Sequence, residues 1–182
     1  IHMPYSQQSR DNLIAEGIKS DHIIVVGSPL PEVYKAQINK VSSNTILKKL
    51  SLTKNNYFIV SVHRSENVDD TKDVRNLCVF LNRLAEHYNK RTILTCHPRL
   101  SSKISEFRES LSKLIEVYQP FDYSSYIKLQ SSALYVMSDS GTLAEEADII
   151  GFNAIWLRNW QERPEAIEEG VLPFTGLNFD II

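Results

Sequence analysis

The chain has 182 residues, of which 42% are hydrophobic and 23% charged, and its formal net charge at pH 7 is -2. These values are typical of a globular domain with a full hydrophobic core. The near-neutral charge argues against nucleic-acid binders and polybasic membrane binders, which usually carry a basic excess. No apolar run approaches the roughly 18 residues of a membrane-spanning helix, and the first residues do not resemble a signal peptide. We therefore expect a cytoplasmic protein that contacts neither nucleic acid nor membrane.

Six short runs rich in β-branched and aromatic residues are predicted to be strands buried on both faces of a sheet. In chain order they cover residues 23–26, 57–62, 92–95, 114–117, 134–137 and 154–157. Amphipathic segments with helical spacing lie among them, over residues 12–16, 74–84, 104–111, 126–130 and 143–150. Ser6 and Ser102 are predicted N-caps, and Gly17 and Gly151 stand where C-terminal caps belong.

Strands that alternate with helices indicate a parallel sheet with right-handed crossovers and helices on both faces. The predicted fold class is therefore α/β, a Rossmann-like doubly wound parallel sheet. Residues 1–45 are less regular, and their polar stretch over 35–43 is compatible with a helix or a linker. The abrupt chain ends suggest a piece of a longer polypeptide. Cys78 and Cys96 are too few for a disulfide framework or a thiolate metal site, so we expect two reduced core residues.

Polar side chains follow five successive predicted strands. In an open parallel sheet, ligands bind beyond the carboxyl ends of the strands, so these side chains are expected to converge on one rim. Chance placement would put one or two polar groups there, and five in succession indicate a binding site. The segments are 63–67 (HRSEN), 97–99 (HPR), 119–123 (QPFDY), 138–142 (SDSGT), and Arg158 followed by 162–165 (ERPE).

The run at 138–142 has the features of a phosphate cradle, without the lysine of a P-loop. Gly141 allows the backbone to approach a ligand closely, while Ser140 and Thr142 add hydroxyl donors. The helix that follows offers unpaired N–H groups to an anion. A plain strand-to-helix turn with Ser140 as its N-cap is the alternative interpretation.

Four arginines are predicted to lie on the same rim: Arg64, Arg99, Arg158 and Arg163. Guanidinium groups match phosphate oxygens bidentately, so a cluster of them at a helix N-terminus favours an anionic ligand. For some of these arginines the alternative is pairing with the carboxylates of Glu66, Glu162 and Glu165.

Histidines, carboxylates and an aromatic residue complete the candidate site. His63 and His97 each follow a strand and could serve as acid or base, as phosphate donor or as structural residues. A metal site is not expected, because no third ligand stands at a suitable spacing. In the adjacent pair Glu145–Glu146, whose side chains point about 100° apart, one carboxylate can face the rim and hold ribose hydroxyls. Tyr126 could stack on a planar base or pack in the core.

Four ordered motifs together resemble the non-hydrolysing UDP-N-acetylglucosamine 2-epimerase family, and the resemblance covers nearly the whole chain. They are 61–67 (SVHRSEN), 96–99 (CHPR), 138–147 (SDSGTLAEEA) and 158–170 (RNWQERPEAIEEG). Residues 12–17 (NLIAEG) and 26–29 (VGSP) also look like the family's interdomain approach. Thr142, where the commonest members carry a second glycine, resembles the capsule and O-antigen branch.

The resemblance implies two Rossmann-like domains in the glycosyltransferase-B arrangement, with this chain as the C-terminal, UDP-holding half. Residues 1–45 would be the interdomain segment and the start of that domain, and residues 46–182 the UDP-binding domain. The missing N-terminal domain would supply the acidic groups for proton transfer at C2. The complete enzyme would be a homodimer that needs no cofactor or metal, and the half alone would be inactive.

Carried over by position, the resemblance assigns His63 to the step in which UDP leaves. It assigns the diphosphate to Ser140, Gly141 and Thr142 with Arg64 and Arg158 nearby, the ribose to Glu146, and a place beside uracil to Tyr126. Five further residues would line the active cleft without an assigned role: Glu66, His97, Arg99, Glu162 and Arg163.

The implied reaction is C2 epimerisation of a UDP-N-acetylhexosamine, in the synthesis of surface-polysaccharide precursors. UDP is eliminated to give a 2-acetamidoglycal and then added back on the other face. Two other functions stay open at this point. One is the donor-binding domain of a glycosyltransferase with the same architecture, and the other is a sugar-nucleotide-binding module without catalysis.

Overall fold

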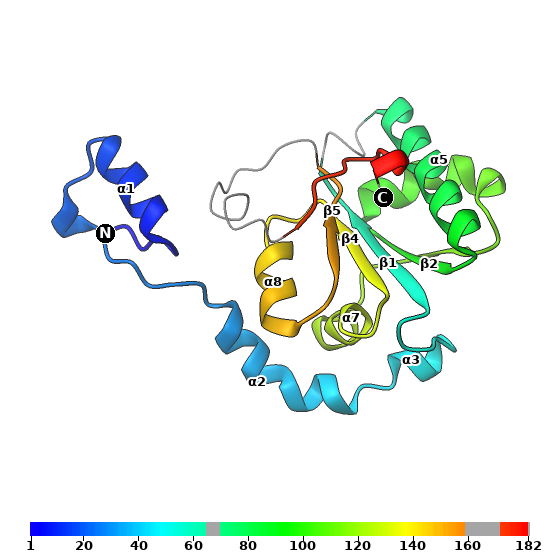
Figure 1. Ribbon diagram of the computed structural model, residues 1–182, viewed down its shortest axis with the longest axis horizontal. Helices are drawn as coiled ribbons and strands as arrows, with labels where there is room; N and C mark the ends of the chain where they lie inside the picture. Colours follow the sequence, from blue (N-terminus) through cyan, green and yellow to red (C-terminus); the bar gives the residue numbers. More distant parts are fainter. Residues whose placement is uncertain (65–69, 159–171, 182) are drawn as a thin grey trace. The chain divides into compact units, whose positions relative to one another are not determined.

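The computed structural model describes residues 1–64, 70–158 and 172–181, and the chain divides into two compact units, Ile1–Ile38 and Asn39–Ile182 (Figure 1). The first unit contains α1 (Gln7–Ala15), the short 3₁₀ helix η1 (Ser20–His22) and the first part of α2 (Leu30–Ser43). The polar stretch at 35–43 is therefore helical. All the strands of the described sheet belong to the second unit.

The second unit alternates strands and helices along the chain. Its elements after α2 are α3 (Ile46–Lys49), β1 (Tyr57–Val62), α5 (Thr71–Tyr88), β2 (Arg91–Cys96), α6 (Pro98–Ile104), η2 (Ser105–Ser110), β3 (Ile115–Tyr118), α7 (Tyr123–Gln130), β4 (Tyr135–Ser138), α8 (Leu143–Ile150), β5 (Ala154–Trp156) and η3 (Phe179–Ile181). The five strands form one parallel sheet in the order β3-β2-β1-β4-β5. Strand β1 pairs with β2 on one side and β4 on the other, so the order of the strands reverses there, as at the switch point of a doubly wound sheet. The predicted fold is confirmed.

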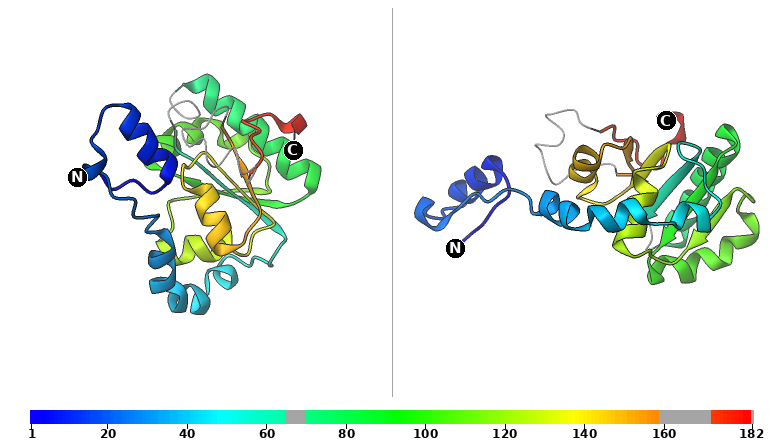
Figure 2. Two further views of the ribbon diagram at one scale, coloured as in Figure 1. Left: turned by 60° about the vertical axis from the view of Figure 1, so that its left-hand side comes forward. Right: turned by 90° about the horizontal axis from the view of Figure 1, so that it is seen from below.

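The sheet has a hydrophobic core on each face because alternate strand residues point to opposite sides. In β1, Phe58 and Val60 join one cluster with the apolar face of α5, and Tyr57 and Ile59 join another with residues of α7 and α8. Figure 2 shows from two further sides how helices cover the strands. Strands β1 and β2 are buried on both faces, as their continuous apolar sequences predict.

Helix α5 forms because its apolar residues recur at helical spacing and both of its ends are capped. Val74, Leu77, Leu81 and Leu84 are fully buried in the core. The Asp70 carboxylate accepts from the Lys72 amide at 3.1 Å and so caps the first turn. The predicted face of this helix is confirmed, and the two cysteines also lie buried in the same core cluster.

Three local predictions can be compared with the capping geometry. Ser6 is confirmed as an N-cap, since its hydroxyl accepts from the Ser9 amide at 3.1 Å. Gly151 is confirmed as the C-cap of α8, with a left-handed φ of 80° that suits glycine. Gly17 follows the C-cap residue Glu16 of α1 and has a φ of 93°.

The predicted strand at residues 23–26 is wrong. Within the first unit the segment pairs only with the chain's first residues, where the Ile24 amide donates to the His2 carbonyl at 3.0 Å and Ile23 and His2 form an isolated bridge. Residues Ile24 to Val26 are 40–53% exposed. β-Branched residues favour a strand only where neighbouring strands are present to pack against. The sequence of this segment does not show whether such neighbours exist.

The helix predicted over 104–111 is a 3₁₀ helix, η2 (Ser105–Ser110), and the prediction of Ser102 as an N-cap is wrong, because Ser102 lies within α6. Helix α6 begins earlier, at Pro98, whose fixed φ suits a first helical turn, and it ends at Ile104. The 3₁₀ helix η2 follows, and in this region hydroxyls bond to local carbonyls: Ser105 Oγ donates to the Ser102 carbonyl at 2.5 Å. Serines compete with regular helix in this way.

Within the described parts of the chain, no helix has the length and apolar character needed to cross a membrane.

We predict that Leu77→Ala will lower the free energy of unfolding by about 2–5 kcal/mol, because it leaves a cavity in the core beneath α5. Val79, on the same helix, is 54% exposed. Val79→Ala should therefore change stability by no more than about 0.5 kcal/mol. Urea denaturation followed by circular dichroism measures both changes. Equal losses for the two variants would contradict the assignment of the buried face.

Candidate functional site

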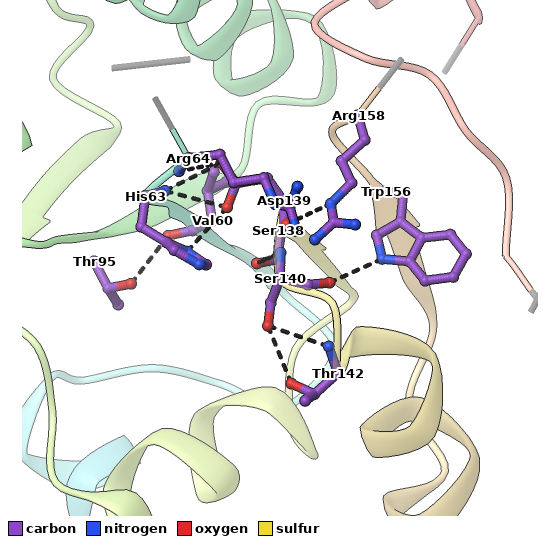
Figure 3. A network of polar contacts seen from close by, with 10 residues as sticks. All are labelled: Val60, His63, Arg64, Thr95, Ser138, Asp139, Ser140, Thr142, Trp156 and Arg158. Carbon is purple, nitrogen blue, oxygen red and sulfur yellow. Dashed lines mark hydrogen bonds and ion pairs between the residues drawn. The ribbon is translucent and has the colours of Figure 1, made fainter. Parts of the chain in front are cut away.

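The candidate site lies at the carboxyl ends of β1, β4 and β5, next to the point where the strand order reverses (Figure 3). His63 and Arg64 follow β1, and residues 139–142 connect β4 to α8. Arg158 follows β5 after one residue. The structure thus brings together segments that are up to about 95 positions apart in the sequence, as expected for the rim of an open parallel sheet.

Asp139 joins two of these strand ends and was not among the residues to which the sequence assigned a role. Its side chain is fully buried and lies 3.0 Å from Nδ1 of His63. It also accepts from the backbone amides of His63, at 3.1 Å, and Arg64, at 2.9 Å. The Asp139 carbonyl accepts from Nε of Arg158 at 2.5 Å. A carboxylate directly after a buried strand needs hydrogen-bond donors or a cation nearby. This requirement is the feature of the sequence from which a role for Asp139 could have been predicted.

The His63 imidazole is half-exposed, and its pKa is raised above 6.5. The largest cause is the hydrogen bond with the Asp139 carboxylate, which favours the charged ring. Partial burial and the positive charges of Arg64 and Arg158 act in the opposite direction. The net direction favours an imidazolium ion at this strand end, next to the two arginines.

The turn between β4 and α8 is held by side chains of β5. Trp156 donates from Nε1 to the Ser140 carbonyl at 3.1 Å, next to the Arg158 contact with Asp139. A methyl group added at Gly141 would lie 3.5 Å from the Arg158 guanidinium, so this cation lies close to the turn. Arg158 is almost fully buried. The turn therefore has a fixed shape, and the Arg158 guanidinium lies close to it.

The hydroxyls of Ser140 and Thr142 are connected by hydrogen bonds to Glu146 on α8. Thr142 occupies the N-cap position but does not cap; its Oγ1 donates to Glu146 at 2.7 Å and lies 3.0 Å from Ser140 Oγ. The other oxygen of Glu146 accepts from the buried Gln130 side chain at 2.8 Å. The interpretation with Ser140 as N-cap is thus wrong, because α8 begins at Leu143 and its N-cap position is Thr142. Gln130 was missed, since a glutamine at the end of a predicted helix carries no signal of its own.

Tyr126 on α7 packs against the core at the edge of the site. Its phenol forms a hydrogen bond with the Ser61 side chain, and burial raises its pKa. Glu146 and Asp139 lie near enough to act on the phenol electrostatically. Of the two adjacent glutamates, Glu146 is the one directed to this cluster.

Of the other predicted site residues, His97 follows β2 at the same edge of the sheet, and the rest are not described in full. His97 is exposed, and its carbonyl accepts from the Leu100 and Ser101 amides at the start of α6. The side chain of Arg99 is not described, and Glu66, Glu162 and Arg163 fall outside the described ranges. Within those ranges, no three His, Cys, Asp or Glu residues are grouped so that they could hold a metal ion.

The whole chain, residues 1–182, matches the family model described as UDP-N-acetylglucosamine 2-epimerase. The chain belongs to this family. A UDP-N-acetylglucosamine 2-epimerase from Salmonella borreze is 30% identical over 181 residues, which cover 93% of this chain and 47% of the relative. A relative of the same name from Methanocaldococcus jannaschii is 29% identical over 177 residues, covering 93% of this chain and 48% of the relative. The chain spans about half the length of these curated relatives.

Solved structures of UDP-N-acetylglucosamine 2-epimerases share this fold. The structure from Rickettsia bellii has a TM-score of 0.87 and 32% sequence identity, and the match covers 97% of this chain and 47% of that one. The Methanocaldococcus jannaschii structure, in complex with UDP-GlcNAc and UDP, has a TM-score of 0.86 and 29% identity, and the match covers 98% of this chain and 51% of that one. These similarities confirm the Rossmann-like fold and the resemblance noted in the sequence.

The raised pKa of His63 predicts how stability depends on pH. The folded state holds the His63 proton more tightly than the unfolded chain, because the folded-state pKa lies above 6.5. The resulting stabilisation is fully present below about pH 6.5 and is lost as pH rises through the folded-state pKa. We therefore expect the difference in unfolding free energy between the unmodified chain and His63→Gln to shrink as pH rises.

Urea denaturation at a series of pH values measures this difference. Val79→Ala serves as a control, because it removes no ionisable group and its difference from the unmodified chain should not vary with pH. A His63→Gln difference that stays constant or grows with pH would contradict the assigned ion pair.

Proposed function

We propose that this chain is the UDP-binding half of a UDP-N-acetylhexosamine 2-epimerase. The observation that carries the proposal is the cluster at the strand-order reversal, where His63, Arg64, Arg158 and the hydroxyls of the β4–α8 turn gather in a member of this family. We propose residues 46–182 as the UDP-binding domain and residues 1–45 as the interdomain segment. The remaining half of the polypeptide would then close over the same edge of the sheet.

The diphosphate is proposed to bind at the turn of residues 140–142, with Arg64 and Arg158 beside it. Ser140 and Thr142 contribute hydroxyl groups, and α8 begins at this point, so its positive dipole end favours an anion. Arg158 is nearly fully buried, and a cation held there strengthens its interaction with a bound phosphate because the surroundings are poorly screened. The backbone of the turn would meet the ligand without reorganising, and the Thr142 hydroxyl, which donates to Glu146 in this structure, would rotate to donate to a phosphate oxygen.

Glu146 is proposed to accept from the ribose hydroxyls, and Tyr126 to lie beside the uracil. A carboxylate offers about four acceptor positions, and in the structure Thr142 and Gln130 each use one. Two positions remain for a diol. The contacts from Thr142 and Gln130 fix the direction of the carboxylate, which is what a bidentate contact with a ribose needs.

The proposed reaction inverts C2 of the sugar by elimination and readdition. A base from the other half of the enzyme takes the C2 proton, the C1–O bond breaks, and its electron pair leaves with UDP to give the 2-acetamidoglycal. Negative charge then grows on the diphosphate, where the arginines and hydroxyls stabilise it. His63, as an imidazolium, can donate a proton to the leaving oxygen. UDP then adds back to C1 while C2 is protonated on the opposite face.

The finer assignments belong to the same proposal. Thr142 in place of a second glycine supports a role in the synthesis of surface polysaccharides, and the complete enzyme is proposed to be a cytoplasmic homodimer. We propose that five further residues line the active cleft without assigning a step to them: Glu66, His97, Arg99, Glu162 and Arg163.

UDP titrated into the chain should perturb the backbone amides of residues 140–142 and of Arg64 in NMR spectra. Arg64→Ala should weaken UDP binding by about 1.5–3 kcal/mol, the contribution expected of a hydrogen bond to a charged group.

Glu146→Gln should weaken UDP binding by a similar amount. Glu145→Gln, at the neighbouring helix position, is the matched control and should leave the affinity for UDP unchanged. Uridine should bind far more weakly than UDP. Perturbations confined to another surface would rule out the proposed site.

The isolated chain is predicted not to epimerise, because it lacks the acidic groups assigned to the other half. Incubation with UDP-N-acetylglucosamine in D₂O should leave the C2 proton signal unchanged, whereas the chain joined to its N-terminal half should exchange that proton for deuterium. Exchange by the chain alone would overturn the predicted inactivity. A joined protein that consumes the sugar nucleotide only with an added acceptor would instead identify a glycosyltransferase.

A further inference from the structure

The Asp139 carboxylate is the most heavily engaged buried charge in the described part of the site. It accepts from the His63 and Arg64 amides and lies 3.0 Å from the His63 ring nitrogen Nδ1. On the basis of the proposed UDP site, we infer that Asp139 is a positioning residue that fixes the His63 imidazole through Nδ1 and keeps it cationic beside the diphosphate. Nε2 is then the ring nitrogen that meets the ligand.

The geometry of the contact determines which nitrogen does the chemistry. A carboxylate only accepts, so Nδ1 of His63 must carry a proton where it meets Asp139. The two backbone amides hold the carboxylate itself in place, and because one of them belongs to His63, ring and backbone are fixed by the same group. When the ring is cationic, Nε2 also carries a proton and can donate it to a departing phosphate oxygen.

The charges around the His63 ring explain why Asp139 is needed to keep the ring protonated. Among the described residues, the charged groups that act on His63 are Asp139 from the β4–α8 turn, Arg64 from its own segment and Arg158 from the segment after β5. Both arginines oppose protonation of the ring, and among the residues that the structure describes only Asp139 favours it. Without this carboxylate, the two arginines would make the His63 ring lose its proton at a lower pH. The arginines needed for the diphosphate therefore create the need for Asp139.

A purely structural role for Asp139 makes a different prediction. If the carboxylate only held the backbone of residues 63–64, its loss would lower stability without changing the protonation of the His63 ring. The positioning role predicts a lower pKa of His63 after Asp139→Asn, because the main interaction that favours the cation is removed.

The first experiment is an NMR titration of the histidine ring protons in the chain without ligand. His63→Gln assigns the His63 signal by its disappearance. In the unmodified chain His63 should titrate above the ordinary value of about 6.5, and Asp139→Asn should lower its pKa. Asp148→Asn is the matched control: it removes the same charge from an exposed position on α8 and should leave the His63 titration unchanged.

Two results would overturn the inference. An unmodified chain in which His63 titrates at or below about 6.5 would do so even if Asp139→Asn fails to fold. A folded Asp139→Asn chain in which the pKa of His63 is unchanged or higher would do so directly.

The second experiment measures UDP affinity between about pH 5.5 and about pH 8.5, across the range in which histidines titrate. Asp139→Asn removes a negative charge from the site, which by itself favours the binding of anionic UDP. The absolute affinity for UDP therefore does not report the protonation of His63. The midpoint of the pH dependence is the better one, and it should move to lower pH in the variant. The terminal phosphate of UDP also titrates in this range, but it does so equally for both proteins.

The two experiments separate the inference from the proposed function. A lowered His63 pKa in Asp139→Asn together with a shifted midpoint for UDP supports both. A lowered pKa in a chain that does not bind UDP supports the Asp139–His63 pairing and overturns the proposed UDP site. Binding of UDP with the same midpoint in both proteins overturns the positioning role and leaves the UDP site in place.

Discussion

The site depends on one buried carboxylate that is satisfied by the ends of two neighbouring strands. Asp139 has no exposed surface, so its charge must be compensated inside the protein, and the amides and ring of the segment after β1 do this. The backbone carbonyl of Asp139 accepts a hydrogen bond from Arg158, which follows β5. One side chain and its backbone therefore link three strand ends, and the positions of His63, Arg64 and Arg158 follow from that link.

 
The sheet makes this link possible because β1 and β4 are neighbours, although 72 residues lie between Val62, at the end of β1, and Tyr135, at the start of β4. After β1, the chain forms β2 and β3 on one side of this strand and then crosses to form β4 on its other side. The segments after β1 and β4 are then left at the same edge without a connection between them, and a ligand can approach there. Hydrophobic clusters on both faces hold the strands in register, so the polar groups at the edge keep their spacing.

The polar groups of the site are fixed by one another before any ligand arrives. Thr142 and Gln130 direct the two oxygens of Glu146, and Trp156 holds the carbonyl of Ser140. Groups held in this way lose little further conformational freedom when a ligand binds. The proposed reaction, in which a diphosphate departs and returns, would use such a surface to keep the leaving group in place between the two steps.

The sequence by itself determined the α/β class, the positions of the five strands of the sheet and the edge on which the polar residues gather, because buried parallel strands are read directly from continuous apolar runs. It also carried the family motifs. It could not determine that the run at 23–26 stays outside the sheet, that Ser140 is not the helix cap, or that Asp139 and Gln130 belong to the site. These depend on which partners each backbone and side chain meets, and those partners lie far away along the chain. Burial of a charge and the hydrogen bonds that compensate it exist only in the tertiary structure, so only the tertiary structure decided them.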